Sequence, residues 1–336
     1  MFFIKPLRDN FENPCNLDRV RCIRNIANSI ETSLFLDLNI LSQIRKVIEE
    51  EVKYEDTFLV EFVDKVKNLS GLNIFISPGF AFLEVSNEYE LRNYNAFEKF
   101  INKYLNEFRD SYDSLPYQIH NNQPDYNNLL PKTKESLSFT YASILLLHYL
   151  DLDKKLSGIE KFKKFMNILH DELDFVDGLV LMIGQYFFCA RLYLNENLRI
   201  MVDNFLKIAH SQKSIRNSLN ATRDIFLYRI LAFIELGWNG MKVQDCWLVT
   251  ADKGIKILSD YIFYMKHSSG KAAIISSYSK EVENNQYFQE SQNYLKELIL
   301  KRCLKSNQND IDSKIKQHKI EIFIKEMEDN FKNFYT

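Results

Sequence analysis

Cysteine is scarce in the chain, and the cysteines that are present form no CxxC pair. Their odd number and wide spacing argue against a disulfide scaffold and against a zinc site, and they are typical of proteins in a reducing compartment. We therefore expect a cytoplasmic protein. The sequence contains five of them: Cys15, Cys22, Cys189, Cys246 and Cys303.

Several familiar catalytic patterns are missing from the sequence. The six histidines show neither HxH nor HExxH spacing, and no Gly-x-Ser-x-Gly elbow is present. Gly254 and Gly270 stand alone, so they form no glycine-rich loop of the kind that cradles a phosphate. These absences argue against a histidine-based metal site, a serine hydrolase of the elbow type and a P-loop protein.

Long apolar runs and an excess of charge of either sign are also absent. The longest apolar stretch, residues 178–190, is broken by Gln185 and is too short to span a bilayer, so we interpret it as a buried helix and expect no membrane partner. The first residues, Met-Phe-Phe-Ile-Lys-Pro, become polar too early for a signal peptide. The net charge is -2, so any attraction to nucleic acid must come from local patches and bound metal.

Proline is confined to the part of the chain up to Pro131, and few glycines interrupt the remainder. Apolar residues three and four positions apart in that remainder predict helices. Residues 311–335 are predicted to form an amphipathic helix, and the Pro- and Asn-rich residues 116–131 a loop or linker. The other predicted helices cover residues 142–151, 159–169, 198–209 and 225–236.

Four short apolar runs differ from the helical sequence around them, because each is bounded by turn or polar residues. Such runs are typical of strands that are covered on both faces in a parallel sheet. Helical sequence separates them, which predicts an α/β sheet with crossover helices. The four predicted strands cover residues 33–36, 72–76, 246–249 and 272–275.

Aspartates follow two of these predicted strands directly. Asp37 comes after Leu-Phe-Leu, and Asp252 comes after Trp-Leu-Val-Thr-Ala. Ligands gather at the carboxyl ends of the strands in an open parallel sheet, so both side chains are expected at one edge. Several carboxylates at one place repel each other, and a divalent cation relieves that repulsion.

Four segments resemble, in the same order along the chain, the motifs of PIN-domain nucleases. The first is a strand followed by Asp-x-Asn, and the second is a strand, a Ser-Pro helix start and a glutamate. The third is an aspartate that opens an apolar helix, and the fourth is a strand followed by Thr-x-Asp. The segments are FLDLNILS (35–42), FISPGFAFLE (75–84), ATRDIFLYRILA (221–232) and WLVTADKGI (247–255).

The resemblance implies a PIN-like fold and hydrolysis of a phosphodiester, with RNA as the expected substrate. It also implies that one or two Mg²⁺ or Mn²⁺ ions are held by oxygen ligands, which suit these hard cations. Asn39 and Thr250 are expected to support the site through hydrogen bonds. The implied metal-binding and catalytic residues are Asp37, Glu84, Asp224 and Asp252.

The spacing departs from that of a compact PIN domain, because Glu84 and Asp224 are far apart in the sequence. We interpret the interval as a large all-α insertion. The predicted organisation is a first part of the PIN-like domain (1–96), the helical insertion (97–212), the second part of the domain (213–280) and a C-terminal helical region (281–336). The third position has rivals within the interval: Asp171, Asp174 and Asp177.

A run of basic residues precedes Asp224. Residues 207–223 carry no acid, and the run is either a solvated helix face or a strip that contacts phosphates and leads substrate to the metal. Lys253 is a further candidate for phosphate contact, since it is adjacent to Asp252. The nucleic-acid-binding candidates are Lys213, Arg216, Arg223 and Lys253.

Three of the four acidic candidates also have an ordinary structural interpretation. Asp37 can be the N-cap of the next helix, Glu84 a surface residue and Asp224 a common helix-start acid. The function that the resemblance favours is an endoribonuclease acting as a toxin or phage-defence effector, with an antitoxin or other regulatory protein as partner and oligomerisation left open. Two alternatives remain: a non-catalytic helical interaction protein with a degenerate PIN-like core, and a small-molecule-binding α/β protein whose acids chelate metal for another purpose.

Overall fold

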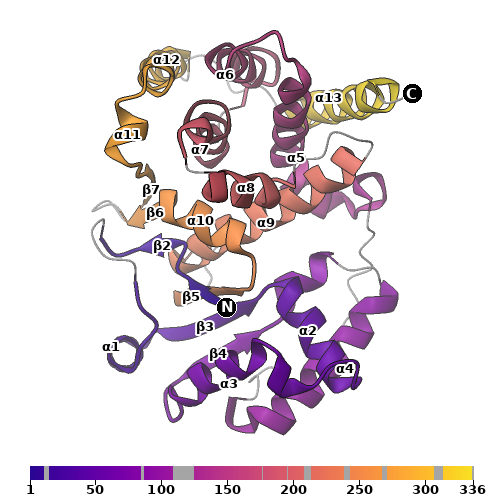
Figure 1. Ribbon diagram of the computed structural model, residues 1–336, viewed down its shortest axis with the longest axis vertical. Coiled ribbons are helices and arrows are strands. Elements are labelled where there is room, and N and C mark those ends of the chain that lie inside the picture. Colours follow the sequence, from indigo (N-terminus) through magenta and orange to yellow (C-terminus); the bar gives the residue numbers. More distant parts are fainter. Residues whose placement is uncertain are drawn as a thin grey trace. The chain divides into compact units, whose positions relative to one another are not determined.

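The computed structural model describes residues 1–10, 15–84, 87–108, 125–175, 177–194, 196–207, 213–237, 243–266, 271–305 and 313–334. The chain divides into two compact units, which are described separately (Figure 1). The first unit comprises residues 1–130, 225–259 and 263–273. The second comprises residues 131–224, 260–262 and 274–336.

A sheet with the strand order β1-β5-β3-β4 forms the centre of the first unit (Figure 1). Its members in the described part of the chain are β1 (Phe2–Ile4), β3 (Glu31–Leu36), β4 (Ile74–Ser77) and β5 (Gln244–Thr250). Strand β3 runs parallel to both neighbours, with Leu36 beside Val249 and Phe35 beside Ser77. The carboxyl ends of β3, β4 and β5 therefore meet at one edge, whereas β1 is antiparallel to β5.

Helices cover this sheet because their apolar residues recur every three or four positions. In α2 (Leu38–Ile48) the buried face consists of Ile40, Leu41, Ile44 and Val47. The other helical elements of the unit are α1 (Arg19–Ala27), η1 (Tyr54–Asp56), α3 (Leu59–Lys67), η2 (Gly79–Glu84), α4 (Asn87–Tyr104), η3 (Asn106–Phe108) and η4 (Tyr126–Asn128). The core that they form with the strands includes Leu34, Leu36, Phe62, Ile76, Phe97, Phe100, Trp247 and Val249.

A second sheet has the strand order β2-β6-β7 among the described residues. Its strands are β2 (Leu7–Arg8), β6 (Ile262–Lys266) and β7 (Ala272–Ser276). Strand β2 is parallel to β6, with Leu7 beside Tyr264. The predicted strand at 272–275 is thus a strand, but it belongs to this second sheet and not to the sheet that contains β3 and β5.

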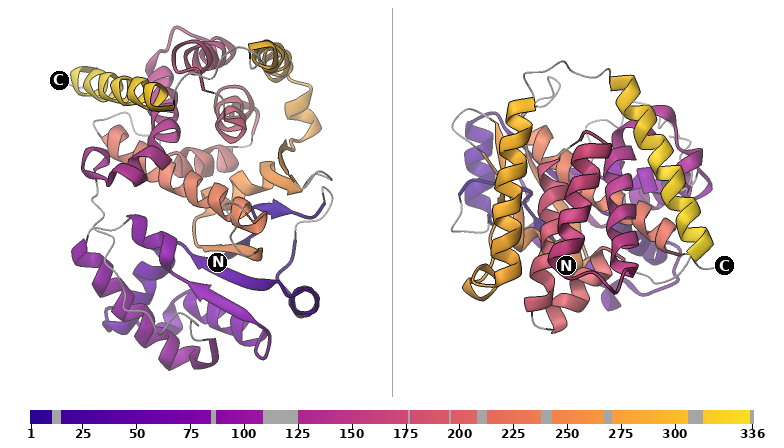
Figure 2. Two further views of the ribbon diagram at one scale, coloured as in Figure 1. Left: turned by 180° about the vertical axis from the view of Figure 1, so that it is seen from behind. Right: turned by 90° about the horizontal axis from the view of Figure 1, so that it is seen from above.

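The second unit is helical. Tyr141 on α5 (Pro131–Leu152) donates a hydrogen bond of 2.8 Å to Glu328 on α13 (Ser313–Phe334), and the two helices pack along each other (Figure 2, magenta and yellow). Ser157 and Glu160 form a capping box at the start of α6 (Gly158–Asn167). Two of the described helices have residues in both units: α9 (Lys213–Glu235) begins in the second unit and continues into the first, and α10 (Lys253–Tyr261) begins in the first. The remaining helical elements are η5 (Ile168–Glu172), α7 (Gly178–Gln185), η6 (Tyr186–Ala190), η7 (Arg191–Tyr193), α8 (Glu196–Phe205), α11 (Lys280–Glu283) and α12 (Gln286–Lys305).

The apolar stretch 178–190 forms α7 and the π-helical turn η6, which confirms the predicted buried helix. Leu179, Val180, Phe187 and Phe188 are all buried there. Among the described helices of the chain, none combines the length and the apolar character that crossing a membrane requires.

The predicted helices 142–151 and 159–169 lie within α5 and within α6 with η5. The predicted helices 198–209 and 225–236 run past the ends of α8 and α9 at Phe205 and Glu235, since residues 206–207 and 236 are turns. The predicted helix 311–335 corresponds to α13, and residues 208–209, 311–312 and 335 are outside the described residues. Most of the predicted loop 116–131 is also outside them; residues 125–130 contain the short helix η4, and α5 starts at Pro131. The mixed α/β class is confirmed. The prediction of a purely parallel sheet was wrong, because the edge strand β1 pairs with β5 in antiparallel orientation.

The compact units are bounded differently from the predicted segments 1–96, 97–212, 213–280 and 281–336. The first boundary falls after Leu130 and the next after Asp224. Residues 274–336 group with residues 131–224 and do not form a region of their own.

Candidate functional site

Asp37 stands where β3 ends and α2 begins. Its backbone N–H donates to the carbonyl of Val249 (3.0 Å), which holds it against β5. Its Oδ1 accepts from the N–H of Leu38 (2.6 Å) and caps α2. The side chain is only 3% exposed, so the carboxylate is placed in the interior at the sheet edge.

Thr250 joins the first and fourth motifs. Its buried hydroxyl donates to Asp37 Oδ2 (2.6 Å) and accepts from the N–H of Asp252 (2.9 Å). Asn39 donates from Nδ2 to the same Oδ2 of Asp37 (2.7 Å) and accepts from the N–H of Ala251 (3.2 Å). The Asp-x-Asn and Thr-x-Asp segments are therefore connected by hydrogen bonds at the ends of adjacent parallel strands.

Asp252 lies just before α10 and is half-buried. Its Oδ1 accepts from the N–H groups of Gly254 (2.6 Å) and Ile255 (3.2 Å), which is the pattern of a helix N-cap. These hydrogen bonds fall on Oδ1, so Oδ2 is the oxygen that is left for a ligand. The neighbouring Lys253 is exposed.

The second motif leaves the same edge of the sheet. Strand β4 ends at Ser77, whose hydroxyl accepts from the N–H of Gly79 (3.2 Å). The Ser-Pro segment then starts the 3₁₀ helix η2, and the ring of Phe80 packs on that of Phe35 at 5.4 Å between centroids. The backbone of Glu84 ends this helix, and its side chain lies outside the described side chains.

Asp224 does not open a helix, so that prediction was wrong. Helix α9 begins at Lys213, because no proline or glycine interrupts residues 213–235 and the helix extends upstream of the apolar run. Asp224 is 4% exposed and pairs with Lys207 at 2.7 Å. It belongs to the second unit, whereas Asp37 and Asp252 belong to the first.

The three rivals for this position have local structural roles. Asp171 interacts with His170 at 2.6 Å, and Asp177 caps α7 by accepting from the N–H of Val180 at 3.0 Å. Asp174 interacts with Arg302 at 3.4 Å and with Lys316 at 3.5 Å. All three lie in the second unit.

The predicted basic strip is only partly presented to solvent. Lys213 and Arg216 are exposed on α9. Arg223 is 4% exposed, which disagrees with its predicted place on a solvent-facing strip. The interior position follows from the helical period, since Arg223 shares a face with buried Leu219 and Leu227.

Within the described side chains, no group of three or more His, Cys, Asp or Glu residues is arranged to hold a metal ion. The acids that the structure brings to the same sheet edge are Asp37 and Asp252, each positioned by a helix N-terminus and by Thr250.

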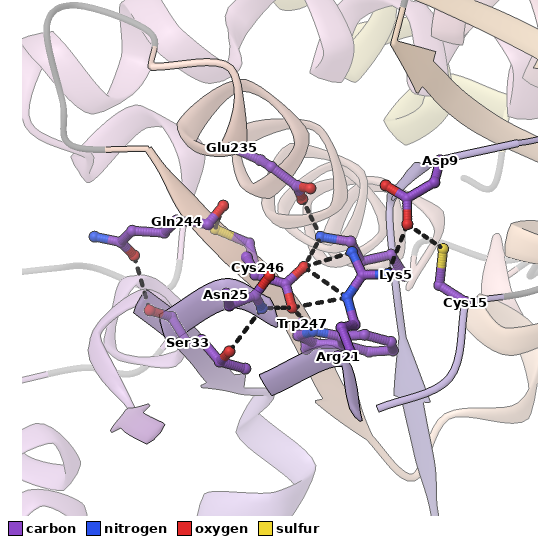
Figure 3. Close-up of polar contacts among 12 residues, drawn as sticks. Lys5, Asp9, Cys15, Arg21, Asn25, Ser33, Glu235, Gln244, Cys246 and Trp247 are labelled. Atoms are coloured by element: carbon purple, nitrogen blue, oxygen red, sulfur yellow. Dashed lines mark hydrogen bonds and ion pairs between the residues drawn. The ribbon is translucent and has the colours of Figure 1, made fainter. Parts of the chain in front are cut away.

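A buried charged network that the sequence patterns did not indicate lies at the opposite, amino-terminal edge of the sheet (Figure 3). At its centre is Asp245, the second residue of β5, which is 2% exposed. Arg21 binds both of its oxygens, with Nη2–Oδ1 at 2.8 Å and Nε–Oδ2 at 2.9 Å. Asn25 (2.8 Å) and the indole N–H of Trp247 (3.0 Å) donate to Oδ2.

Lys5 connects Asp245 to a second acid in this network. Its ammonium lies 2.5 Å from Asp245 Oδ1 and also forms an ion pair with Glu235. Burial would raise the pKa of Asp245, but Arg21 and Lys5 together hold that pKa below its ordinary value. Burial raises the pKa of Glu235 to about 7 despite the opposing effect of Lys5. Asp245 and Glu235 share Lys5, and Glu235 is the first of the two acids to take up a proton as the pH falls.

Glu235→Gln is expected to remove one pH-dependent component of stability. The folded state binds the Glu235 proton more tightly than the unfolded chain, whose ordinary pKa is 4.5, so this contribution is complete below pH 4.5 and is lost as pH rises through about 7. The unfolding free energy of the wild type, relative to the variant, should fall by roughly 3 kcal/mol across that interval.

Urea unfolding at several pH values measures this difference. The matched control is Glu55→Gln, which makes the same exchange at an exposed acid of the same unit. A parallel pH course for the wild type and Glu235→Gln would show that Glu235 titrates normally in the folded protein.

Comparison of the chain with protein-family models, curated proteins and solved structures gave no match. The site itself defines an α/β protein with two aspartates at the carboxyl ends of adjacent parallel strands.

Proposed function

We propose that the protein is a metal-dependent phosphodiesterase of the PIN-like type that cleaves RNA. The observation that carries the proposal is the hydrogen bonding of Thr250 to both Asp37 and the backbone of Asp252. It connects two segments that are distant in the sequence, and these are the segments whose Asp-x-Asn and Thr-x-Asp patterns resemble that family. Carboxylates at the ends of parallel strands are where such a sheet binds its ligands.

The donor chemistry of the site fits Mg²⁺ or Mn²⁺. Asp37 and Asp252 supply carboxylate oxygens, and hard divalent cations favour oxygen ligands. When bound, such a metal lowers the pKa of a water molecule and stabilises negative charge on a phosphodiester. Asp37 and Asp252 would hold the metal, and Glu84 is the further proposed ligand on the segment that follows β4.

The neighbouring residues orient these ligands. Thr250 and Asn39 both donate to Asp37 Oδ2 and so fix the plane of its carboxylate. Hydrogen-bonding partners of this kind set the direction of a metal ligand. Lys253, exposed beside Asp252, is the proposed contact to a substrate phosphate. The ion pair of Asp224 with Lys207 disfavours Asp224 as a metal ligand.

A cytoplasmic toxin or phage-defence endoribonuclease, controlled by an antitoxin or another regulatory protein, is the biological role that we propose with this activity. It rests on the family resemblance and on the absence of a CxxC or disulfide pattern in the sequence. The exposed Lys213 and Arg216 on α9 are proposed to contact the RNA backbone.

The second candidate function is a non-catalytic interaction protein with a degenerate PIN-like core. The observation that favours it is the engagement of both aspartates in ordinary capping: Asp37 caps α2, and Asp252 accepts from two N–H groups of α10. In this interpretation the sheet edge is a structural junction, and the helical second unit provides the binding surface.

Cleavage assays distinguish the two functions. The full chain is incubated with total RNA, tRNA, single-stranded DNA and duplex DNA, in Mn²⁺ or in EDTA. We expect RNA cleavage in Mn²⁺ and none in EDTA. Intact RNA under every condition would favour the interaction protein, and metal-dependent cleavage of DNA alone would retain the activity but correct the substrate.

Mn²⁺ is also expected to raise the melting temperature of the full chain. A ligand that binds only the folded form at about 100 times its Kd adds about 2.7 kcal/mol, which corresponds to a rise of roughly 5 °C. The control is the Asp252→Asn variant, which should lose most of the shift because one proposed ligand is neutral. Equal melting of the wild type in Mn²⁺ and in EDTA would contradict metal binding.

A further inference from the structure

A pocket of about 200 Å³ opens at the amino-terminal edge of the first sheet, on the opposite side from Asp37 and Asp252. Its floor includes Gln244 and Asp245 at the start of β5, and its walls come from β2, α1 and β6. Pockets for drug-sized ligands span roughly 300–1,000 Å³, so this one suits a smaller molecule.

The acids of the pocket are already compensated. Asp245 and Glu235 bind Lys5, and both oxygens of Asp245 also bind the Nε–Nη2 edge of the Arg21 guanidinium. Arg21 further contacts Asp9 at 2.6 Å. These groups form a fixed charged floor, because each buried partner is held by ion pairs from elements that are distant in the sequence.

Additional cations surround this floor. Arg24 on α1 and Lys266 at the end of β6 are exposed, line the pocket and have no ion-pair partner among the described residues. Arg8 on β2 lies with its guanidinium 3.8 Å from the ring centroid of Phe263, which fixes it in the wall of the pocket. With Lys5 and Arg21 included, cations outnumber the three acids by two.

The lining is also rich in hydrogen-bond donors. Arg8, Arg24 and Lys266 carry only donors on their side chains, and the amides of Asn28 and Gln244 add further polar groups. A net excess of two positive charges complements a dianion, and guanidinium groups match the geometry of phosphate oxygens.

We infer that this pocket binds a phosphomonoester, through Arg8, Arg24 and Lys266. The shared chemistry is a terminal phosphate dianion, carried either by a small metabolite such as a mononucleotide or by the 5′ end of an RNA strand. The site is separate from the proposed metal site at the other edge of the sheet, and it does not depend on nuclease activity.

Calorimetric titration of the full chain at constant ionic strength tests the inference. The probes are inorganic phosphate, adenosine 5′-monophosphate, and a short RNA with either a 5′-phosphate or a 5′-hydroxyl. We expect binding of phosphate and the mononucleotide, with affinity reduced at least about tenfold in the double variant Arg24→Gln/Lys266→Gln. Tighter binding of the 5′-phosphorylated RNA than of its 5′-hydroxyl form would assign the ligand to a strand end.

The matched control is Lys67→Gln/Lys99→Gln, which removes the same charge from exposed positions of the first unit outside the pocket. Its affinity for the mononucleotide should equal that of the wild type. If the first double variant misfolds, the single variants Arg24→Gln and Lys266→Gln, both at exposed positions, carry the test. Failure of the wild type to bind millimolar phosphate or mononucleotide, or equal binding by all variants, would overturn the inference.

Discussion

Asp37→Asn is expected to lower metal-dependent RNA cleavage by on the order of a hundredfold or more. The proposed metal loses a negatively charged ligand at the position where the carboxylate is 3% exposed and oriented by Thr250 and Asn39. Loss of a partner that merely orients a ligand already costs roughly 10–100-fold, so loss of the ligand charge should cost at least as much. Initial rates of RNA cleavage against Mn²⁺ concentration measure the effect.

The same exchange also disturbs a hydrogen-bonding arrangement, and the assay must separate the two effects. Oδ2 of Asp37 accepts from Thr250 and Asn39, so an amide nitrogen there would oppose their donors at a cost of about 1–3 kcal/mol. Rates are therefore measured well below the melting temperature of each variant.

Asp18→Asn is the matched control for this exchange. Asp18 is the exposed N-cap of α1 and accepts from the N–H of Arg21 at 2.8 Å, so the substitution repeats the same chemical change at a helix start away from the site. We expect wild-type cleavage by Asp18→Asn. Undiminished cleavage by folded Asp37→Asn would remove Asp37 from the mechanism.

Asp245→Ala is expected to destabilise the first unit by about 3–5 kcal/mol. Removing one member of a buried ion pair leaves the opposite charges without compensation, and that penalty exceeds the value of the pair itself. In this network Arg21 loses both carboxylate oxygens and Lys5 keeps only Glu235. The indole N–H of Trp247 also loses its acceptor. Urea unfolding near neutral pH measures the change in unfolding free energy.

Asp9→Ala provides the comparison for this prediction. Asp9 is exposed and binds the same guanidinium of Arg21, at 2.6 Å, but an exposed ion pair contributes only about 0–1 kcal/mol. The structure therefore predicts a large cost at Asp245 and a small one at Asp9. A similar loss of unfolding free energy in Asp9→Ala and Asp245→Ala would show that burial does not increase the contribution of the Asp245 ion pairs to stability.

The sequence predicts the strands that are apolar on both faces, because burial on both sides of a sheet leaves an uninterrupted apolar run. Residues 33–36 and 246–249 fall in β3 and β5, and the last three residues of the predicted run 72–76 fall in β4. The aspartates after β3 and β5 meet at one edge. Strands β1 and β2 are only three and two residues long, so they carry too little periodicity to be predicted.

Two features of the site depend on information that local patterns do not contain. The apolar run that follows Asp224 predicts a helix start at that residue. In the structure the more polar residues from Lys213 onward already form the first turns of the same helix, α9. The network of Lys5, Arg21 and Asp245 joins residues more than two hundred positions apart, as in the Arg21–Asp245 separation of 224. Contacts of that range are set by the pairing of β5 with β1 and β3.

The indole of Trp247 provides a spectroscopic probe of one unit alone. Trp247 belongs to the first unit and is fully buried, and its indole N–H donates to Asp245. In a Trp238→Phe variant, tryptophan emission comes from Trp247 alone and should follow melting of the first unit, while far-UV circular dichroism is weighted toward the helices of the second. Comparing the two signals in one denaturation experiment separates the stabilities of the two units.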